Sequence, residues 1–214
     1  MLPMTEDFRA RLSDVLARRR PQRVRVSDAR DAAVLVPIIA EPEPTLLFTL
    51  RSEHLPSHKG QISFPGGSID DEDPSAQVAS LREAEEEVGL SPTLVEILGE
   101  LDSVPTFVSG YVIAPFVGWV REAPELQPNP DEVAAVLHVP IADLTEEIRT
   151  EPGFEHRGRT FPTEAWVWRD QVIWGATARV LRLFLERLAE ADLIEAPSPT
   201  LSWELLHRDR GSNA

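Results

Sequence analysis

The stretch SFPGGSIDDEDPSAQVASLREAEEEVGL, residues 63–90, joins a glycine-rich turn, FPGG, to a segment with four glutamates among five residues. Signals for a helix bound this segment. Asp73 suits an N-cap, Pro74 suits the first helical position, and Gly89 stands where a left-handed residue commonly ends a helix. We therefore expect a helix over roughly residues 74–88.

The glutamates of this expected helix gather on one face. At about 100° per residue, Glu83, Glu86 and Glu87 fall within roughly a third of the circumference, and the apolar Leu81 and Val88 lie opposite. On an exposed helix this would be a solvated acidic face, where a like-charge pair costs only a few tenths of a kcal/mol. In a cleft, each pair about 5 Å apart would cost roughly 3 kcal/mol, and a divalent cation would remove that cost. The helix alone leaves both interpretations open.

The turn and the helix together resemble the Nudix box, whose pattern is Gly, five residues, Glu, seven residues, then Arg-Glu-aliphatic-x-Glu-Glu-x-Gly-aliphatic. The second half is matched by Arg82, Glu83, Glu86, Glu87, Gly89 and Leu90. The first half departs from the pattern, because Asp73 stands where the first glutamate is expected and eight residues separate it from Arg82. We interpret Asp73 as the counterpart with a one-residue insertion, and its role as an N-cap stays the alternative.

The preceding residues narrow the resemblance to a subgroup. LFTLRSEHLPSHKGQISFPGG, residues 47–67, is similar to the signature of Nudix enzymes that cleave coenzyme A and its derivatives. The matching positions are Thr49, Arg51, Ser52, Gly60 and FPGG. Phe48 replaces a leucine, and Pro56 stands where the subgroup usually has arginine. With APFVGW, NPDEV and IWGATARVL further on, the resemblance covers about residues 30–190.

This resemblance implies a fold and a reaction. The expected fold class is α/β (α+β), a Nudix α/β/α sandwich with a mixed central sheet and the catalytic helix after the glycine-rich loop. Residues 1–214 are expected to form a single domain, with a core at about 30–190, an N-terminal helix and a C-terminal extension. The implied reaction is metal-dependent hydrolysis of the diphosphate of coenzyme A or its derivatives to 3′,5′-ADP and 4′-phosphopantetheine. The alternatives are a Nudix diphosphatase for ADP-ribose or another nucleotide diphosphate derivative, and a non-catalytic Nudix binding module.

The resemblance also assigns residues. Mg²⁺ or Mn²⁺ is implied as the cofactor, and the scattered histidines and absent cysteine disfavour zinc. The implied metal ligands are Glu83, Glu86 and Glu87, which with Arg82 form the catalytic set. Glu83 is a ligand or the general base, and Arg82 is expected to orient a glutamate. The expected substrate contacts are Arg51, Lys59, Gly66 and Gly67. The candidates for a further carboxylate from a later loop are Glu100, Asp102, Glu147 and Glu151.

Periodicity predicts the remaining elements. The expected strands are 33–39, 45–51, 94–104, 111–120, 132–140 and 163–167, and the expected further helices are 5–19, 141–149 and 175–191. Trp166, Trp168 and Trp174 are interpreted as core residues rather than as a platform for adenine.

Charge and composition bound the partners. The net charge of −15 disfavours binding to nucleic acid or to an anionic membrane. The absence of cysteine excludes a disulfide framework and a thiolate nucleophile. With no signal-peptide pattern and no apolar run long enough to span a bilayer, we expect a cytoplasmic protein with a small-molecule substrate. The N-terminal helix and residues 196–207 are candidates for a homodimer contact.

Overall fold

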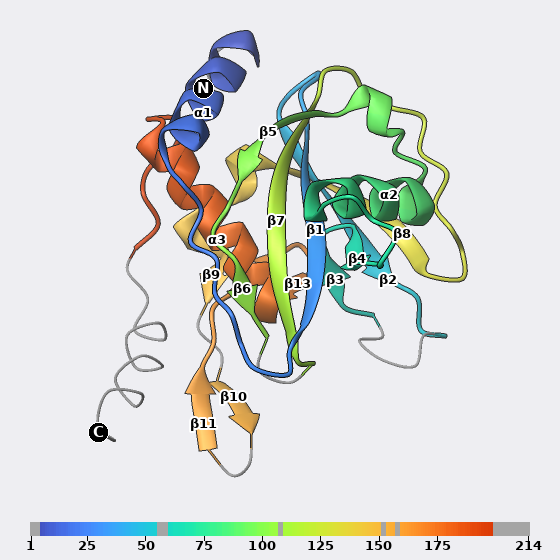
Figure 1. The fold of residues 1–214 in the computed structure, drawn as a ribbon. Helices are drawn as coiled ribbons and strands as arrows, with labels where there is room; N and C mark the ends of the chain where they lie inside the picture. Colours follow the sequence, from blue (N-terminus) through green and yellow to red (C-terminus); the bar gives the residue numbers. More distant parts are fainter. Residues whose placement is uncertain (1–4, 55–59, 107–108, 151–152, 157–158, 199–214) are drawn as a thin grey trace.

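The computed structural model describes residues 5–54, 60–106, 109–150, 153–156 and 159–198. A mixed sheet runs through the middle of the molecule, with α2 on one face and α1 and α3 on the other (Figure 1). The helices are α1 (Thr5–Arg18), α2 (Ala76–Val88) and α3 (Gly175–Glu190). This is the sandwich that the sequence predicts.

The central sheet is organised around β1 (Arg30–Ile39) and β7 (Tyr111–Val120), which pair in parallel along their whole length. The other strands of this sheet are β2 (Thr45–Arg51), β3 (Ile62–Ser63), β4 (Gly66–Ser68), β5 (Glu96–Glu100), β6 (Val104–Pro105) and β8 (Val133–Pro140), and their pairings are antiparallel. The path of the sheet is β3-β2-β1-β7-β5, and β4 pairs with β1 beside it. This pairing sets the glycine-rich turn against the middle of the sheet.

Five short strands lie outside the central sheet. They are β9 (Arg149–Thr150), β10 (Gly153–His156), β11 (Arg159–Pro162), β12 (Ala165–Trp168) and β13 (Gln171–Trp174). β12 pairs with both β13 and β9, and β10 pairs with β11.

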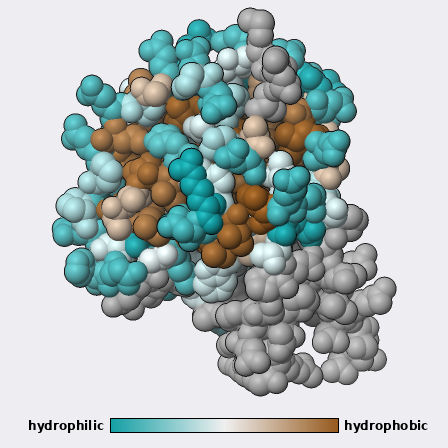
Figure 2. Space-filling model, turned by 180° about the vertical axis from the view of Figure 1, so that it is seen from behind, coloured by the Kyte–Doolittle hydropathy of each residue, from teal (hydrophilic) through white to brown (hydrophobic). Residues whose placement is uncertain are grey.

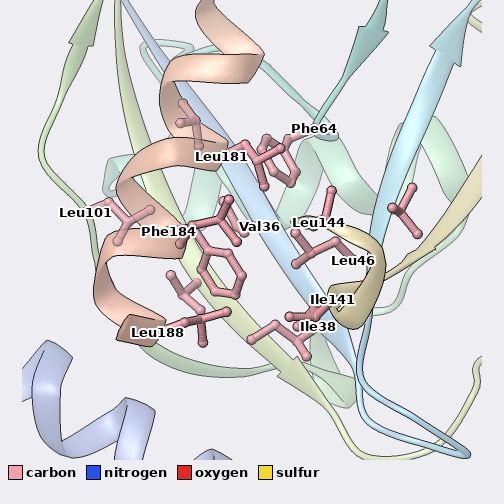
Figure 3. Packing of buried hydrophobic residues seen from close by; sticks show 14 of the residues in the cluster. Val36, Ile38, Leu46, Phe64, Leu101, Ile141, Leu144, Leu181, Phe184 and Leu188 are labelled. Atoms are coloured by element: carbon pink, nitrogen blue, oxygen red, sulfur yellow. The ribbon is translucent and has the colours of Figure 1, made fainter. Parts of the chain in front are cut away.

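Two apolar layers hold the sandwich together. On the α3 side, Phe184, Leu181 and Leu188 point from the helix onto sheet residues such as Val36 and Ile38 (Figure 3). Each fully buried side chain of this kind stabilises the fold by roughly 1.5–3 kcal/mol. A smaller layer joins the apolar side of α2 to the opposite face of the sheet. The carboxylate side of α2 is therefore turned away from the apolar core.

The tryptophans confirm part of their predicted role. Trp166 and Trp168 are buried in the layer beneath α3, and the Trp168 indole N–H donates to Asp143 at 2.8 Å. Trp174 is half-buried.

Several element boundaries agree with the sequence, since β2 and β7 have the predicted bounds and α3 is one residue shorter. The predicted helix over 141–149 is wrong. Two short 3₁₀ turns, Ile141–Asp143 and Glu146–Ile148, stand there instead, and Arg149 then pairs with Trp166. Pairing between distant strands has overridden the local helical pattern.

The predicted strand over 94–104 is also wrong in its middle, because it divides into β5 and β6. At the break, the Ser103 N–H donates to the Gln22 carbonyl at 2.9 Å, and the Asp102 carboxylate accepts from the Gln22 N–H at 2.7 Å. The segment after α1 thus takes hydrogen bonds that a continuous strand would have used.

The surface seen from behind carries hydrophobic side chains in separate patches, which hydrophilic side chains divide (Figure 2). In the part of the chain that the structure describes, the exposed large hydrophobic residues are Val24, Val26, Val78, Leu94, Val167 and Val172. The homodimer contact stays a prediction.

Candidate active site

The glycine-rich turn lies close to its neighbours on both sides. Gly66 has φ +153°, and a Cβ there would stand 2.4 Å from the Ala33 carbonyl oxygen of β1. A Cβ on Gly67 would stand 2.6 Å from the Glu83 carboxylate of α2. At Gly66 only a residue without a side chain allows this approach to β1, and at Gly67 the absence of a side chain lets Glu83 lie against the turn. The turn therefore places its backbone directly against the acidic face of α2.

Local signals fix where α2 begins and ends. The Ser75 hydroxyl accepts the Val78 N–H at 3.3 Å, so Ser75 is the N-cap and the predicted capping role of Asp73 is wrong. At the other end Gly89 adopts the left-handed conformation, with φ 71°, as predicted. The helix starts two residues later than residue 74, which frees Asp73 for another contact.

That contact is a paired hydrogen bond with Arg82. The guanidinium donates from Nε and Nη2 to the two carboxylate oxygens of Asp73, at 3.1 and 2.9 Å. These bonds hold the pKa of Asp73 below its ordinary value. Nη1 of the same arginine lies 3.0 Å from Glu83 and 2.9 Å from Glu86. Arg82 thus joins Asp73 to two of the three predicted ligands, in the orienting position that the sequence suggests.

Glu87 is the most deeply placed acid of the helix, with only 3% of its surface exposed. Its Oε2 accepts the Gly66 N–H at 3.2 Å, and its Oε1 lies 3.9 Å from Arg51 Nη1. The pKa of Glu87 is raised to about 8, chiefly by burial and also by the charges of Glu83 and Glu132, while the Gly66 N–H and Arg51 oppose the shift. The surroundings of the Glu87 carboxylate therefore neutralise its negative charge poorly.

Glu83 and Glu86 differ from Glu87 in exposure. The Glu83 side chain is 17% exposed, and burial raises its pKa, while Arg82 opposes that shift. The Glu86 side chain is 58% exposed and turns toward Arg82. Within the described residues, no three side chains of the His, Cys, Asp and Glu types stand together as a metal cluster.

The donor set nevertheless fits a hard divalent cation. Carboxylate oxygens are the ligands that Mg²⁺ and Mn²⁺ prefer. Glu83 and Glu87 are desolvated, and the charge of Glu83 raises the pKa of Glu87, so a cation between them would relieve both the burial and the repulsion. Of the predicted ligands, Glu86 is the most exposed, and its carboxylate accepts a hydrogen bond from Arg82 Nη1 at 2.9 Å.

The predicted substrate contacts are brought together in part. Arg51, Gly66 and Gly67 meet around Glu83 and Glu87, and the buried Nε of Arg51 has no hydrogen-bond partner among the described residues. Lys59 lies outside the described residues. Arg51 is therefore a cation from outside α2 that the structure places beside the acidic helix.

A further acid, Glu132, belongs to this site and was missed by sequence reasoning. Its charge raises the pKa values of both Glu83 and Glu87. Its carbonyl accepts the Ser52 N–H at 2.8 Å, which ties the NPDEV segment to the residue after Arg51. The signal that could have identified it is the acidic pair Asp131-Glu132 within NPDEV.

Two of the four acids that the sequence suggested for this role, Glu100 and Asp102, form ion pairs elsewhere. Glu100 pairs with Arg23 at 2.7 Å and Asp102 pairs with Arg19 at 2.9 Å, both near the segment that follows α1. Glu147 is exposed in the 3₁₀ turn Glu146–Ile148. Glu151 lies outside the described residues.

Comparisons with known proteins agree with this geometry. The family described as NUDIX domain matches residues 29–163. The protein named Uncharacterized Nudix hydrolase NudL from Escherichia coli (strain K12 / DH10B) is 44% identical over 155 residues, which cover 72% of this chain and 80% of that protein. Its namesake from Shigella sonnei (strain Ss046) is 41% identical over 182 residues, covering 84% and 92%.

A solved structure shares the fold. The MutT/nudix family protein from Enterococcus faecalis superposes with a TM-score of 0.55 at 15% identity, covering 85% of this chain and 69% of that one. In the described part of the chain, no helix combines the length and the apolar character that crossing a membrane requires. By its box helix, its glycine turn and these matches, the chain belongs to the Nudix hydrolase family, enzymes that act on nucleoside diphosphate derivatives and generally use divalent metal ions.

Proposed function

We propose that this Nudix hydrolase cleaves the diphosphate bond of coenzyme A or its derivatives, giving 3′,5′-ADP and 4′-phosphopantetheine. The observation that carries the proposal is the position of Arg51. This arginine belongs to the segment that resembles the coenzyme A subgroup, and its Nη1 lies 3.9 Å from Glu87 of the box helix. The segment that marks the subgroup therefore contributes directly to the acidic site.

In this proposal Glu83, Glu86 and Glu87 hold Mg²⁺ or Mn²⁺. The metal, when bound, neutralises the diphosphate and lowers the pKa of a bound water. Arg82 keeps Glu83 and Glu86 within one hydrogen-bonded group, and Asp73 holds Arg82 in turn. Such supporting bonds orient ligands and limit their motion.

The cationic side of the site comes from Arg51 and, by the resemblance, Lys59. Arg51 brings a guanidinium to an otherwise acidic site, where a diphosphate would be repelled. Gly66 and Gly67 let the backbone of the turn lie directly against the acids of α2, where the resemblance places the diphosphate. Together these groups bind the substrate and orient its two phosphorus atoms.

Glu83 is either a ligand or the general base. Burial raises its pKa, which suits a group that accepts a proton near neutral pH. The variant Glu83→Gln separates the roles. If Glu83 is a ligand, its loss weakens Mn²⁺ binding in a titration. If Glu83 is the base, its loss leaves Mn²⁺ binding unchanged and removes the rise of kcat with pH that follows deprotonation of the base.

The test of the proposal compares substrates at equal Mg²⁺ or Mn²⁺. We expect a higher kcat/KM for coenzyme A, or for one of its acyl or disulfide forms, than for ADP-ribose, with 3′,5′-ADP as a product. Faster hydrolysis of ADP-ribose would overturn the coenzyme A assignment and leave a Nudix diphosphatase for another nucleotide. The absence of hydrolysis with every substrate would favour a binding module.

A matched pair of variants on α2 supports the assignment of the acids. Glu86→Gln is expected to reduce turnover by orders of magnitude with the fold intact. Glu85→Gln removes a neighbouring exposed carboxylate on another side of the same helix, and its turnover should stay within about twofold of the wild type. Equal activity in both variants would contradict the metal assignment.

A further inference from the structure

An arginine and a tyrosine form a stacked pair where β1 and β7 begin. Arg30 and Tyr111 are the first residues of these strands and lie opposite each other in the register. The Arg30 guanidinium lies 4.3 Å from the ring centroid of Tyr111, which is the only tyrosine of the chain. Contact with an aromatic face orients a guanidinium and leaves its opposite face and its N–H groups free.

The backbone around this pair is well fixed. The Arg30 N–H donates to the Gly110 carbonyl at 2.9 Å, and the Tyr111 N–H donates to the Thr106 hydroxyl at 2.8 Å. Both residues are therefore positioned before any ligand arrives, which lowers the entropy lost on binding.

Hydrogen bonds connect the pair with the acidic site. The Ser68 hydroxyl donates to the Tyr111 hydroxyl at 3.4 Å, and the Ser68 carbonyl accepts from Arg82 at 3.3 Å. Ser68 follows Gly67 and pairs with Ala32 of β1. Arg30 comes two residues before Ala32, about 7 Å along the strand. A ligand whose diphosphate lies at the box helix thus has its next groups within reach of Arg30.

The charge of Arg30 is not balanced by any carboxylate that the structure describes. Three arginines of the same basic stretch are neutralised by carboxylates, namely Arg18 by Asp14, Arg19 by Asp102 and Arg23 by Glu100. Arg30 is exposed and forms no salt bridge with any residue that the structure describes. In a chain of net charge −15, an arginine left without a carboxylate beside the active site suits an anionic group of the substrate.

We propose that Arg30, backed by Tyr111, binds the phosphomonoester that coenzyme A carries on its ribose 3′ position. The inference rests on the proposed function and deepens it. ADP-ribose and 3′-dephospho-coenzyme A lack this phosphate, so Arg30 would select substrates with a third phosphate beyond the scissile diphosphate. A planar guanidinium donates two parallel N–H groups to a phosphate, which gives such a contact its specificity.

The experiment compares Arg30→Gln with the wild type on coenzyme A and on 3′-dephospho-coenzyme A. We expect kcat/KM for coenzyme A to fall about tenfold, mainly through KM, because one charge-assisted hydrogen-bonded contact is lost. For the dephosphorylated substrate the change should stay below about twofold. Arg30→Lys, which keeps the charge, should recover part of the loss on coenzyme A.

Arg169→Gln is the matched control. Arg169 stacks on Trp168 at 4.2 Å, and it lies in the β12–β13 turn beyond Trp168, whose indole bonds Asp143. It resembles Arg30 in its ring contact but belongs to another part of the fold. Arg169→Gln should change kcat/KM by less than about twofold for both substrates.

Direct binding separates this inference from the proposed function. Calorimetry should show that the wild type binds 3′,5′-ADP more tightly than 5′-AMP. Arg30→Gln should bind 3′,5′-ADP no more tightly than 5′-AMP. An equal effect of Arg30→Gln on both substrates, or no effect on either, overturns the inference while coenzyme A hydrolysis still supports the function. Absence of coenzyme A hydrolysis by the wild type removes the function instead, and the binding comparison then decides the inference.

Discussion

Two buried glutamates, Glu164 and Glu87, have opposite electrostatic surroundings. Glu164 is 6% exposed, and its Oε1 lies 2.5 Å from Arg149 Nε and 2.6 Å from Arg182 Nη1. Glu87 is 3% exposed, yet Arg51 Nη1 is 3.9 Å from its carboxylate, and among the described residues only the Gly66 N–H donates a hydrogen bond to that carboxylate. The two glutamates are buried to a similar extent, but Glu164 has two arginines in close contact and Glu87 has none.

The difference separates a structural acid from a functional one. Burial raises the pKa of each glutamate, and two arginines oppose that shift at Glu164. Arg149 belongs to β9 and Arg182 to α3, so Glu164 ties these elements together. At Glu87 the neighbouring acids add to the effect of burial. The positive charge that Glu87 lacks is the charge that a divalent cation would bring.

The largest expected effect comes from Glu164→Gln. Removing the carboxylate that two arginines contact should lower the free energy of unfolding by about 3–5 kcal/mol. Because the change is remote from α2, the turnover of the folded protein should stay within about twofold. Urea denaturation followed by assays below the transition measures both quantities. Large loss of turnover with unchanged stability would contradict the structural role.

Glu87→Gln should have the reverse outcome. We expect kcat to fall by about two to three orders of magnitude, since an interaction made at the reacting diphosphate is lost. The stability of the metal-free protein should not fall, because the amide, like the protonated carboxyl of Glu87, is uncharged in this buried position. Steady-state kinetics and thermal melts of the same preparation test this contrast. Wild-type turnover in the variant would show that Glu87 is no part of the active site.

The dependence of stability on pH sharpens the comparison. The pKa of Glu87 is raised from 4.5 to about 8, so the folded protein holds a proton there that the unfolded chain releases. The stability that this proton provides is complete below about pH 4.5 and is lost as the pH rises through about 8. Without metal, Tm should therefore fall over this window more steeply in the wild type than in Glu87→Gln.

Divalent cations provide the control for that measurement. Mg²⁺ or Mn²⁺ binds the ionised carboxylates, so it should raise Tm more at pH 8 than at pH 5. Equal slopes of Tm against pH in the wild type and in Glu87→Gln would contradict the assigned environment of this glutamate.

The smallest expected effect is that of Ser75→Ala. Loss of the hydroxyl that accepts the Val78 N–H should cost about 1 kcal/mol of stability. The carboxylates of α2 stay in place, so kcat should be unchanged within about twofold. Chemical denaturation and a standard assay measure the two effects. A large fall in kcat would show that the start of α2 controls the acids that follow.

Local chemistry made much of the fold predictable. The bounds of β2 and β7 follow from their apolar character, and the end of α2 follows from the conformational freedom of Gly89. The segment over 141–149 could not be predicted, because its helical pattern yields to the pairing of Arg149 with Trp166. That pairing depends on residues distant in the chain.

The site shows the same division. Helical spacing alone brings Glu83, Glu86 and Glu87 together. The place of Glu132 depends on the antiparallel pairing of β8 with β2, which carries the NPDEV segment to Ser52. The sequence offered Asp73 two roles, as the counterpart of the first box glutamate or as the N-cap, whereas the structure gives the cap to Ser75 and pairs Asp73 with Arg82. Sequence spacing alone does not show whether Asp73 or Ser75 caps the helix.

The contact between Gly67 and Glu83 has an evolutionary consequence. The space that an alanine methyl group would need is occupied by the carboxylate of Glu83, a flexible side chain that can move aside. A drift from Gly67 to Ala would thus spare the architecture and displace a reactive group. Homologues with a bulkier residue at this position should be folded proteins that have lost hydrolytic activity. The residue at this position would then mark homologues without catalytic activity.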